Sequence, residues 1–384
     1  MRRSWIIPAL TRLFAIGALL LFVVRSIAAQ ETSRLRVEGA PSVRIGTEGD
    51  IHSEFTRIAS AIQLSDKSIA VVVVGSSDVR VFDPMGNHLR TFGRRGSGPG
   101  EYQQMHFVAR AGDTLVLYDF GLRRLTSLDV RSGRVNSTTL TPATASPMVP
   151  VGRFDDGSLV MRESPTTSLK RRQGTRRDSL DLVVVSPRGN VVHRIGRFAG
   201  DAMFAFNPDN TESARAVLGH PLGPRLHVMM SKDRVGVADG TQRMVTWFDR
   251  RGRKTGTTSL PLEKRAYDEN AVTNARDRLL RQGVPEKERA LIAELFSRTS
   301  RGPEQPTFST VHVSAAGDLW IARFSPDILA GPTDYLVVDS RGNAVGSVTL
   351  PAGFRVTEIG ADYILGVRSD ADRVESVEMY RYAR

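Results

Sequence analysis

Residues 68–93 read SIAVVVVGSSDVRVFDPMGNHLRTFG and predict three consecutive strands. Ile69–Val74 is an apolar run rich in β-branched residues, and Val79–Asp83 alternates between apolar and polar residues. His88–Phe92 follows a turn at Pro84–Asn87, where proline and glycine interrupt the strand pattern. The stretch therefore contains most of one antiparallel sheet.

This arrangement returns along the whole chain. A strand that ends in Asp or Ser is followed three or four residues later by a glycine at Asp83–Gly86, Asp129–Gly133, Ser186–Gly189, Asp249–Gly252 and Asp339–Gly342. A second landmark, a polar tight turn followed by a short apolar strand, occurs six times, around Asp66, Asp113, Asp156, Asp233, Asp318 and Asp362. Three of the intervals between these turns are 44 to 46 residues, the period of a four-stranded repeat.

One such sheet cannot cover both of its faces, so the repeats are expected to stack around an axis until the ring closes. We therefore predict an all-β fold, a single six-bladed β-propeller that occupies residues 30–384. The last copy, Tyr363–Tyr382, supplies only about three strands. The missing strand is predicted in Arg34–Gly46, so that an N-terminal strand completes the C-terminal blade.

The first 29 residues have the pattern of a signal peptide. Arg2, Arg3 and Arg12 precede the 12-residue apolar run Leu13–Val24, and small residues follow near Ala29. The run is short for a membrane span, which needs about 20 residues. We expect the segment to be cleaved, which gives a periplasmic or extracellular protein with no stable membrane span. The alternative is that it stays uncleaved as an anchor. The pair Arg2-Arg3 also permits export by the twin-arginine route.

Composition excludes several kinds of chemistry. The chain has no cysteine, which excludes disulfides, thiol catalysis and thiolate metal sites. The net charge is +12, and only six of the 53 basic residues are lysines. Nucleic acid is not the expected partner, because an exported protein seldom meets it, and an arginine-rich solvated surface accounts for the basic clusters.

The segment FGRRGSGPGEY, residues 92–102, resembles the link between blades in NHL-repeat and TolB-like six-bladed propellers. In that family a Phe-Gly end, a glycine-rich turn and a Gly-Glu-Phe-like triplet lead into the next inner strand, and here the triplet is Gly100-Glu101-Tyr102. Asp119 with Arg124, and Asp239 with Arg243, are similar to the Asp and Arg that flank the family's second-to-third strand turn. The resemblance implies a propeller that serves either as an enzyme or as a scaffold.

The long insertions are all predicted on one face of the ring. The face that carries the connections between the second and third strands, and between consecutive blades, is called the long-loop face below, and the opposite face is the short-turn face. The insertions are Ser164–Arg177, Arg197–Arg225, Leu262–Pro306 and Ser325–Thr333. Insertions confined to one face of a repeat fold usually mark its binding face, although loop growth without a role is the alternative.

The insertion at about 262–306, between blades four and five, is predicted to be helical. Glu263–Arg281 and Glu286–Arg298 bracket Gly283 and Pro285, and Ala290–Phe296 carries apolar residues with a helical period. Two helices placed there are expected to cover the axial opening of the ring.

Three histidines are candidates for an axial metal site. His106, His227 and His312 each fall near the start of an inner strand, although His106 lies seven residues before its turn Asp and the other two lie six. Strand alternation then points at least one of them elsewhere, and lone histidines at strand edges are more often structural. We predict no metal site and no cofactor, with a divalent metal at these histidines as the alternative.

Known catalytic patterns are matched only in part. Met105–Val108 partly matches the zinc-binding Pro-His-x-Leu segments of peptidyl-hydroxyglycine lyases, which are propellers of this type. A GxSxG nucleophile elbow is absent. The alternative function is therefore a metal-dependent hydrolase or lyase with an axial site.

The remaining candidate is a cationic rim on the long-loop face. Arginines outnumber acids there and suit carboxylate, phosphate or sulfate groups through forked hydrogen bonds. The predicted ligand-binding residues are Arg94, Arg95, Arg124, Arg162, Arg243, Arg323 and Arg368. We predict an exported, monomeric, non-catalytic recognition module whose partner is a protein, a peptide, a glycan or an anionic small ligand.

Overall fold

The fold was examined in a computed structural model of the chain. It describes residues 35–46, 49–140, 147–164, 172–209, 211–281, 284–326, 331–370 and 372–383. The predicted signal peptide, residues 1–29, lies outside the described residues.

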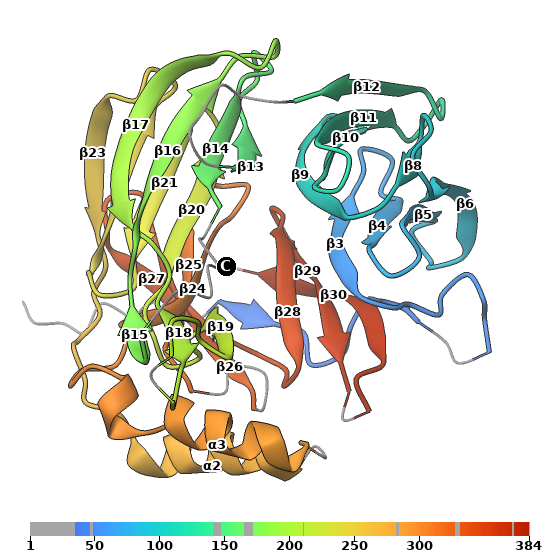
Figure 1. The fold of residues 1–384 in the computed structure, drawn as a ribbon. Coiled ribbons are helices and arrows are strands. Elements are labelled where there is room, and N and C mark those ends of the chain that lie inside the picture. The colour runs from blue at the N-terminus through green and yellow to red at the C-terminus, as the bar shows by residue number, and fades with distance from the viewer. Residues whose placement is uncertain are drawn as a thin grey trace, which may run out of the picture.

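The described residues form six main antiparallel sheets, each a blade of a propeller, and so confirm the predicted six-bladed ring (Figure 1). Blades 1 and 2 contain β3 (Ile58–Gln63), β4 (Ile69–Val73), β5 (Asp78–Phe82), β6 (His88–Phe92), β9 (Met105–Ala111), β10 (Thr114–Asp119), β11 (Arg124–Asp129) and β12 (Val135–Thr139). Blades 3 and 4 contain β13 (Met148–Arg153), β14 (Leu159–Glu163), β16 (Ser179–Val185), β17 (Val191–Ala199), β20 (Leu226–Ser231), β21 (Arg234–Asp239), β22 (Met244–Asp249) and β23 (Lys254–Ser259). Blade 5 contains β24 (Phe308–Val313), β25 (Leu319–Arg323), β26 (Thr333–Val338) and β27 (Ala344–Leu350).

Blade 6 is built from both ends of the chain. Its C-terminal strands are β28 (Phe354–Ile359), β29 (Tyr363–Ser369) and β30 (Glu375–Ala383). The N-terminal strands β1 (Arg36–Val37) and β2 (Val43–Ile45) both pair antiparallel with β30. The predicted closure by residues 34–46 is confirmed, with an interruption between the two short strands.

Apolar clusters between neighbouring blades hold the ring together. The second strand of each blade is covered on both faces, which explains why its sequence is almost wholly apolar. In β4, for example, all five residues are buried. Between blades 1 and 2, Val72 and Val81 pack with Leu115 and Leu117, and each of the other five blade interfaces has a cluster of the same kind.

The link between blades 1 and 2 is fixed by the Asp and Arg of the NHL-like pattern. The carboxylate of Asp119 is buried and accepts the backbone N–H groups of Gln103 at 2.6 Å and Gln104 at 3.1 Å. Arg124 donates to the carbonyl oxygens of Ser97, at 3.0 Å, and Glu101. These two side chains therefore position the entry into the inner strand β9.

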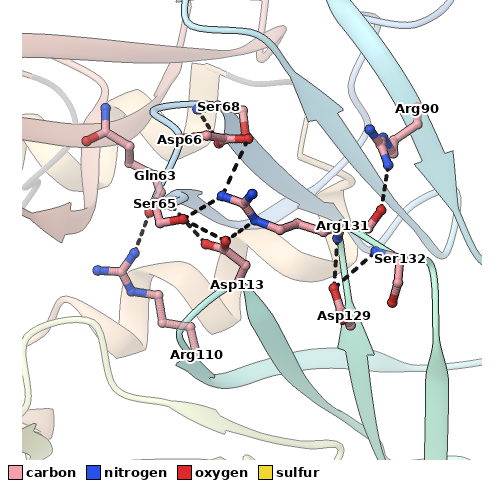
Figure 2. A network of polar contacts seen from close by, with 10 residues as sticks. All are labelled: Gln63, Ser65, Asp66, Ser68, Arg90, Arg110, Asp113, Asp129, Arg131 and Ser132. Atoms are coloured by element: carbon pink, nitrogen blue, oxygen red, sulfur yellow. Dashed lines mark hydrogen bonds and ion pairs between the residues drawn. The ribbon is translucent and has the colours of Figure 1, made fainter.

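A polar network joins blades 1 and 2 on the short-turn face (Figure 2). Ser65 donates its backbone N–H to Asp113 Oδ1 at 2.9 Å and its hydroxyl to Oδ2 at 2.7 Å. Arg131 forms an ion pair with Asp113, donates to Ser65 Oγ at 2.7 Å and lies 3.9 Å from Asp66 Oδ2. The repeated turns of this face thus link one blade to the next.

A second link extends this network to blade 6. Arg110 of blade 2 donates to the carbonyl oxygen of Gln63 in blade 1 and lies 3.1 Å from Glu358 of blade 6. Glu358 in turn accepts the backbone N–H of Gln63 at 2.8 Å. Three inner strands, β9, β3 and β28, are therefore connected by one arginine and one carboxylate.

The repeated glycine of the third turn has a packing reason. In blade 4, Gly252 has a φ of +75° and lies against the outer strand of blade 3, where an added Cβ would stand 2.3 Å from the carbonyl oxygen of Arg194. Both the left-handed backbone and the close approach require glycine. The sequence signal that defined the repeat is thus a contact between blades.

The two longest insertions pack against each other. The insertion 197–225 contributes β18 (Met203–Phe206) and β19 (Ala216–Gly219). These strands form a three-stranded sheet with β15 (Gly174–Arg176), which comes from the 2–3 connection of blade 3, and this sheet was not predicted. Helices α2 (Glu269–Arg281) and α3 (Glu286–Leu295) lie beside β18 and β19 at the lower end of Figure 1. The helical prediction for 262–306 is confirmed.

The predicted start of the first helix, Glu263, was wrong. The helix begins at Glu269 because the Asp268 carboxylate accepts the N–H groups of Asn270 at 3.0 Å and Ala271 at 3.2 Å and so caps it. The second helix ends at Leu295, and a 3-10 turn follows at Arg298–Ser300. Within the described residues, no helix combines the length and the apolar character that crossing a membrane requires.

Candidate functional site

A cavity of about 610 Å³ lies between the inner strands of blades 4, 5 and 6 on the long-loop face. Its walls come from the starts of the inner strands β20, β24 and β28. The connection between β25 and β26 and the end of the insertion before β20 complete them. The lining residues are Pro221, Gly223, Arg225, His227, Phe308, Ser309, Thr310, His312, Phe324, Ser325, Pro326, Thr333, Tyr335, Phe354, Arg355 and Val356.

Two imidazoles from neighbouring inner strands line this cavity. His227 lies on β20, and its ring centroid is 5.4 Å from that of Phe308. His312 lies on β24, and its ring centroid is 6.1 Å from that of Tyr335. His312 Nε2 is 3.4 Å from Thr310 Oγ1, whereas His227 Nε2 is buried and has no hydrogen-bond partner among the described residues. Burial lowers the pKa of both histidines to about 4, so both are neutral at pH 7.

Two arginines also line the cavity. Arg355 donates from Nη1 to the carbonyl oxygen of Ala59 at 3.1 Å and from Nη2 to that of Ile58 at 2.7 Å, which fixes its guanidinium against blade 1. Arg225 is exposed, and its side chain forms no hydrogen bond or ion pair within the described part of the chain. No aspartate or glutamate belongs to the lining, although Asp201 interacts electrostatically with Arg225 and Glu375 with Arg355.

The cavity walls are held by the core of the propeller. Phe308 and Phe354 are each 2% exposed and Tyr335 is 3% exposed, and all three belong to clusters between blades. At the entry to β20, Asp201 accepts the backbone N–H of Leu226 at 2.8 Å. The walls that come from strands are therefore held by the packed core, and the rest of the lining comes from connecting segments.

A second hollow, of about 810 Å³, lies on the same face between blades 1 and 2. It is lined by Arg57, Val74, Arg95, Gly96, Gln103, Gln104, Met105, His106 and Phe120. Phe120 is 41% exposed there, and Arg95 is exposed as well. We take the first cavity as the candidate site because two half-buried imidazoles, two arginines and four aromatic rings converge on it.

The three histidines considered as candidates for a metal site divide between these two hollows. His227 and His312 share the first cavity, and His106 lines the second. Among the residues that the structure describes, no group of three or more His, Asp or Glu side chains is arranged to hold a metal ion.

The seven predicted arginines are spread over the long-loop side of the ring, and most of them have protein partners. Arg94 lies 2.7 Å from Glu101, Arg162 lies 2.6 Å from Asp201, and Arg368 lies 3.7 Å from Glu378. Arg243 donates to the carbonyl oxygen of Leu262 at 3.0 Å, and Arg124 holds the blade link described above. Arg95 lines the second hollow, and Arg323 is exposed at the end of β25.

The arginines of the candidate cavity, Arg225 and Arg355, were not among those predicted. Arg225 is the last residue of a predicted insertion and comes directly before an inner strand. This position in the sequence could have identified it as a candidate for the long-loop face. Arg355 is the second residue of the sixth inner strand, and nothing in the local sequence distinguishes it from other strand arginines.

Comparison with known proteins supports the fold. A family model described as a 6-bladed beta-propeller, DUF5128, matches residues 52–172, which is less than half of the chain. No curated protein matches the sequence.

Two solved structures share the architecture at low sequence identity. A member of the DUF4221 family from Bacteroides vulgatus is 9% identical with a TM-score of 0.52, and the match covers 92% of this chain and 99% of that one. A Bacteroides fragilis protein described as a candidate exported protein is 12% identical with a TM-score of 0.50, and the match covers 92% of this chain and 97% of that one. At these identities the likeness concerns the fold alone, and the fold is a six-bladed β-propeller with a helical insertion.

Proposed function

We propose that this protein is an exported, non-catalytic recognition module of the NHL or TolB-like type, and that it binds its ligand in the cavity between blades 4, 5 and 6. The observation that carries the proposal is the preformed cavity on the face that holds all the long insertions. Its polar groups converge from three different blades, and its walls are fixed by the core. Concave sites with a few convergent polar groups and apolar walls are the usual form of a ligand site.

Export is supported by the leader-like pattern of residues 1–29 and by the description of the Bacteroides fragilis relative in fold. The NHL-like assignment is supported by Asp119 and Arg124, which position the link between blades. Fractionation of cells that express the full chain, with N-terminal sequencing of the product, tests export. Recovery of the uncleaved chain in the cytoplasm would contradict it.

The experiment for the cavity is a binding screen of peptides, glycans and acidic lipids with a blocked variant. Pro326→Trp places a large side chain in the lining of the cavity from a loop, and Pro303→Trp makes the same change at an exposed position outside the lining. Binding that survives in P303W and is lost in P326W supports the proposal. Binding that P326W leaves intact would place the ligand elsewhere.

The second candidate is a metal-dependent hydrolase or lyase with an axial site. The observation in its favour is that His227 and His312 line the same cavity. Metal analysis of the purified protein decides between the two functions, because one divalent ion per chain would favour the enzyme.

A further inference from the structure

We propose that the ligand of the cavity between blades 4, 5 and 6 is a small organic carboxylate with an apolar body. The inference rests on the proposed function and adds the chemical class of the ligand. Three properties of the cavity lead to it: its charge, the state of its imidazoles and the character of its walls.

The charge of the cavity favours an anion. Arg225 forms no hydrogen bond or close ion pair within the described part of the chain, although Asp201 interacts with it electrostatically. Arg355 uses part of its guanidinium on the carbonyl oxygens of Ile58 and Ala59. No carboxylate lines the cavity, and the two acids that act on these arginines have other partners. Asp201 pairs with Arg162 and accepts the backbone N–H of Leu226, and Glu375 accepts the backbone N–H of Ile58. A guanidinium in a partly enclosed site binds a carboxylate through forked hydrogen bonds that are stronger than those in open water.

The imidazoles favour the same kind of group. His227 Nε2 is buried without a partner, so a ligand atom that hydrogen-bonds to it would satisfy a polar group whose isolation costs free energy. A neutral imidazole donates its N–H to a carboxylate without adding repulsion toward the two arginines.

The pKa values follow from the groups around each ring. Burial is the main cause that lowers both pKa values. For His227, the charges of Asp201 and Asp239 raise the pKa, and those of Arg225 and Arg162 lower it. For His312, the neighbouring groups His227 and Arg355 lower the pKa further. An added carboxylate raises the pKa of a neighbouring imidazole because it stabilises the charged form. Binding of the ligand is therefore expected to raise the pKa of both histidines.

The walls favour a ligand with an apolar body over an inorganic anion. Phe308, Phe324, Tyr335 and Phe354 line the cavity together with the arginines. A volume of about 610 Å³ suits a small organic molecule or the last residues of a peptide. The apolar surface of such a ligand would be removed from water mainly by the half-buried Phe324, because the other three rings are themselves almost fully buried.

Calorimetry with matched probes tests the class of ligand. The probes are 3-phenylpropionate, the neutral 3-phenylpropanol, phenyl phosphate, and acetyl-Ala-Phe with a free or an amidated C-terminus. We expect 3-phenylpropionate or the free-acid peptide to bind at least about tenfold more tightly than its uncharged counterpart. The stronger of the two acids identifies the source of the carboxylate.

Variants of the full chain locate the charge effect. Arg225→Gln is expected to weaken the acid by about tenfold or more and the neutral probe by less than about twofold. Arg251→Gln, an exposed arginine on the short-turn face, is the control and should change neither. In NMR titrations, the acid should raise the pKa of His227 and His312 in the wild type.

The outcomes separate this inference from the proposed function. Equal binding of acid and neutral probes, tighter binding of phenyl phosphate, an unchanged affinity in R225Q or no binding of any probe would each overturn the carboxylate assignment. In all these cases the recognition function would still stand if another ligand from the screen were lost in P326W. If no ligand were sensitive to P326W, both proposals would fail.

Discussion

Arg44 Nη2 lies 2.6 Å from Glu378 Oε1, and the carboxylate of Glu378 is fully buried. Arg44 belongs to β2 and Glu378 to β30, so the ion pair joins the N-terminal strand to the C-terminal strand within blade 6. The hydroxyl of Tyr380 also donates to Glu378, at 2.6 Å, and Arg368 lies 3.7 Å from it. A buried carboxylate thus has its partners on both segments that close the ring.

Replacing Arg44 should weaken this closure. Arg44→Ala removes the nearest cation from a buried carboxylate that keeps Tyr380 and Arg368, so the free energy of unfolding is expected to fall by about 1–3 kcal/mol. Arg36→Ala, an exposed arginine on the neighbouring strand β1, should cost less than about 0.5 kcal/mol. Urea denaturation measures both, and equal losses would show that the ion pair does not stabilise the closure.

The network of Figure 2 predicts a loss of stability in acid. The hydrogen bonds from Ser65 and the ion pair with Arg131 lower the pKa of Asp113 to about 2, below the ordinary value of 3.8. The stabilisation is therefore complete above about pH 4 and disappears as the pH falls through about 2. Because solvent screens the half-exposed Arg131, Asp113→Asn is expected to cost about 1 kcal/mol at pH 7 and progressively less below pH 4.

Asp233 occupies the corresponding turn of blade 4 and is exposed. Within the described residues its side chain forms no hydrogen bond or ion pair with a neighbouring blade, so Asp233→Asn is the control. Unfolding curves between pH 2 and 7 should show a pH-dependent difference for D113N and a flat, small difference for D233N. A constant cost of D113N across this range would rule out the linkage.

The glycine of the third turn should tolerate no side chain. Gly252→Ala combines a left-handed backbone with a Cβ that meets the carbonyl oxygen of Arg194, and the expected loss of stability is about 3 kcal/mol. Gly317 has a similar φ of +92° but has nothing within 4 Å of an added Cβ. Gly317→Ala should therefore cost only about 1 kcal/mol, and the difference between the two variants in thermal or urea unfolding measures the contact between blades.

His220 predicts a second pH dependence, in the insertion beside β19. Its Nδ1 accepts the backbone N–H of Leu222 at 3.1 Å and its Nε2 is 3.2 Å from Ser300 Oγ, an arrangement that needs the neutral ring. Burial lowers its pKa from 6.5 to about 4. The unfolded chain then binds more protons between these values, so stability is complete above about pH 6.5 and falls as the pH approaches 4.

Replacing this histidine should reduce that dependence. His220→Gln is expected to make the fall between pH 6.5 and 4 smaller by about 2 kcal/mol. His193→Gln, an exposed histidine on the outer strand β17, is the control. An unchanged slope in H220Q would show that His220 does not cause this pH dependence.

The ring could be predicted from the sequence because its repeat depends on local patterns with a fixed period. The apolar run Ile69–Val74 results from burial of the second strand of the blade. The repeated glycines result from the close approach of the turn between the third and fourth strands to the preceding blade. The start of α2 was misjudged because the prediction did not take account of Asp268, whose side chain caps the helix.

The candidate site was less predictable, since the partner of an arginine depends on residues far away in the sequence. Arg162 meets Asp201 and Arg243 meets the carbonyl group of Leu262, and neither contact can be read from strand spacing. Arg225 and Arg355 come together at one cavity only because blades 4 and 6 both border blade 5 on the same face. Histidine positions were more informative, because their offsets from the repeat turn already separated His106 from His227 and His312.

The division of blade 6 between the two ends of the chain also sets an order of folding. Strands β1 and β2 emerge first during synthesis, yet their hydrogen-bonding partner β30 ends at Ala383 and emerges last. Pairings so distant in sequence have a high loop-closure entropy and form late. A nascent chain can therefore stack its early blades but cannot close the ring before β30 is available. A truncated or slowly synthesised chain remains in this open intermediate, in which it is most exposed to proteases.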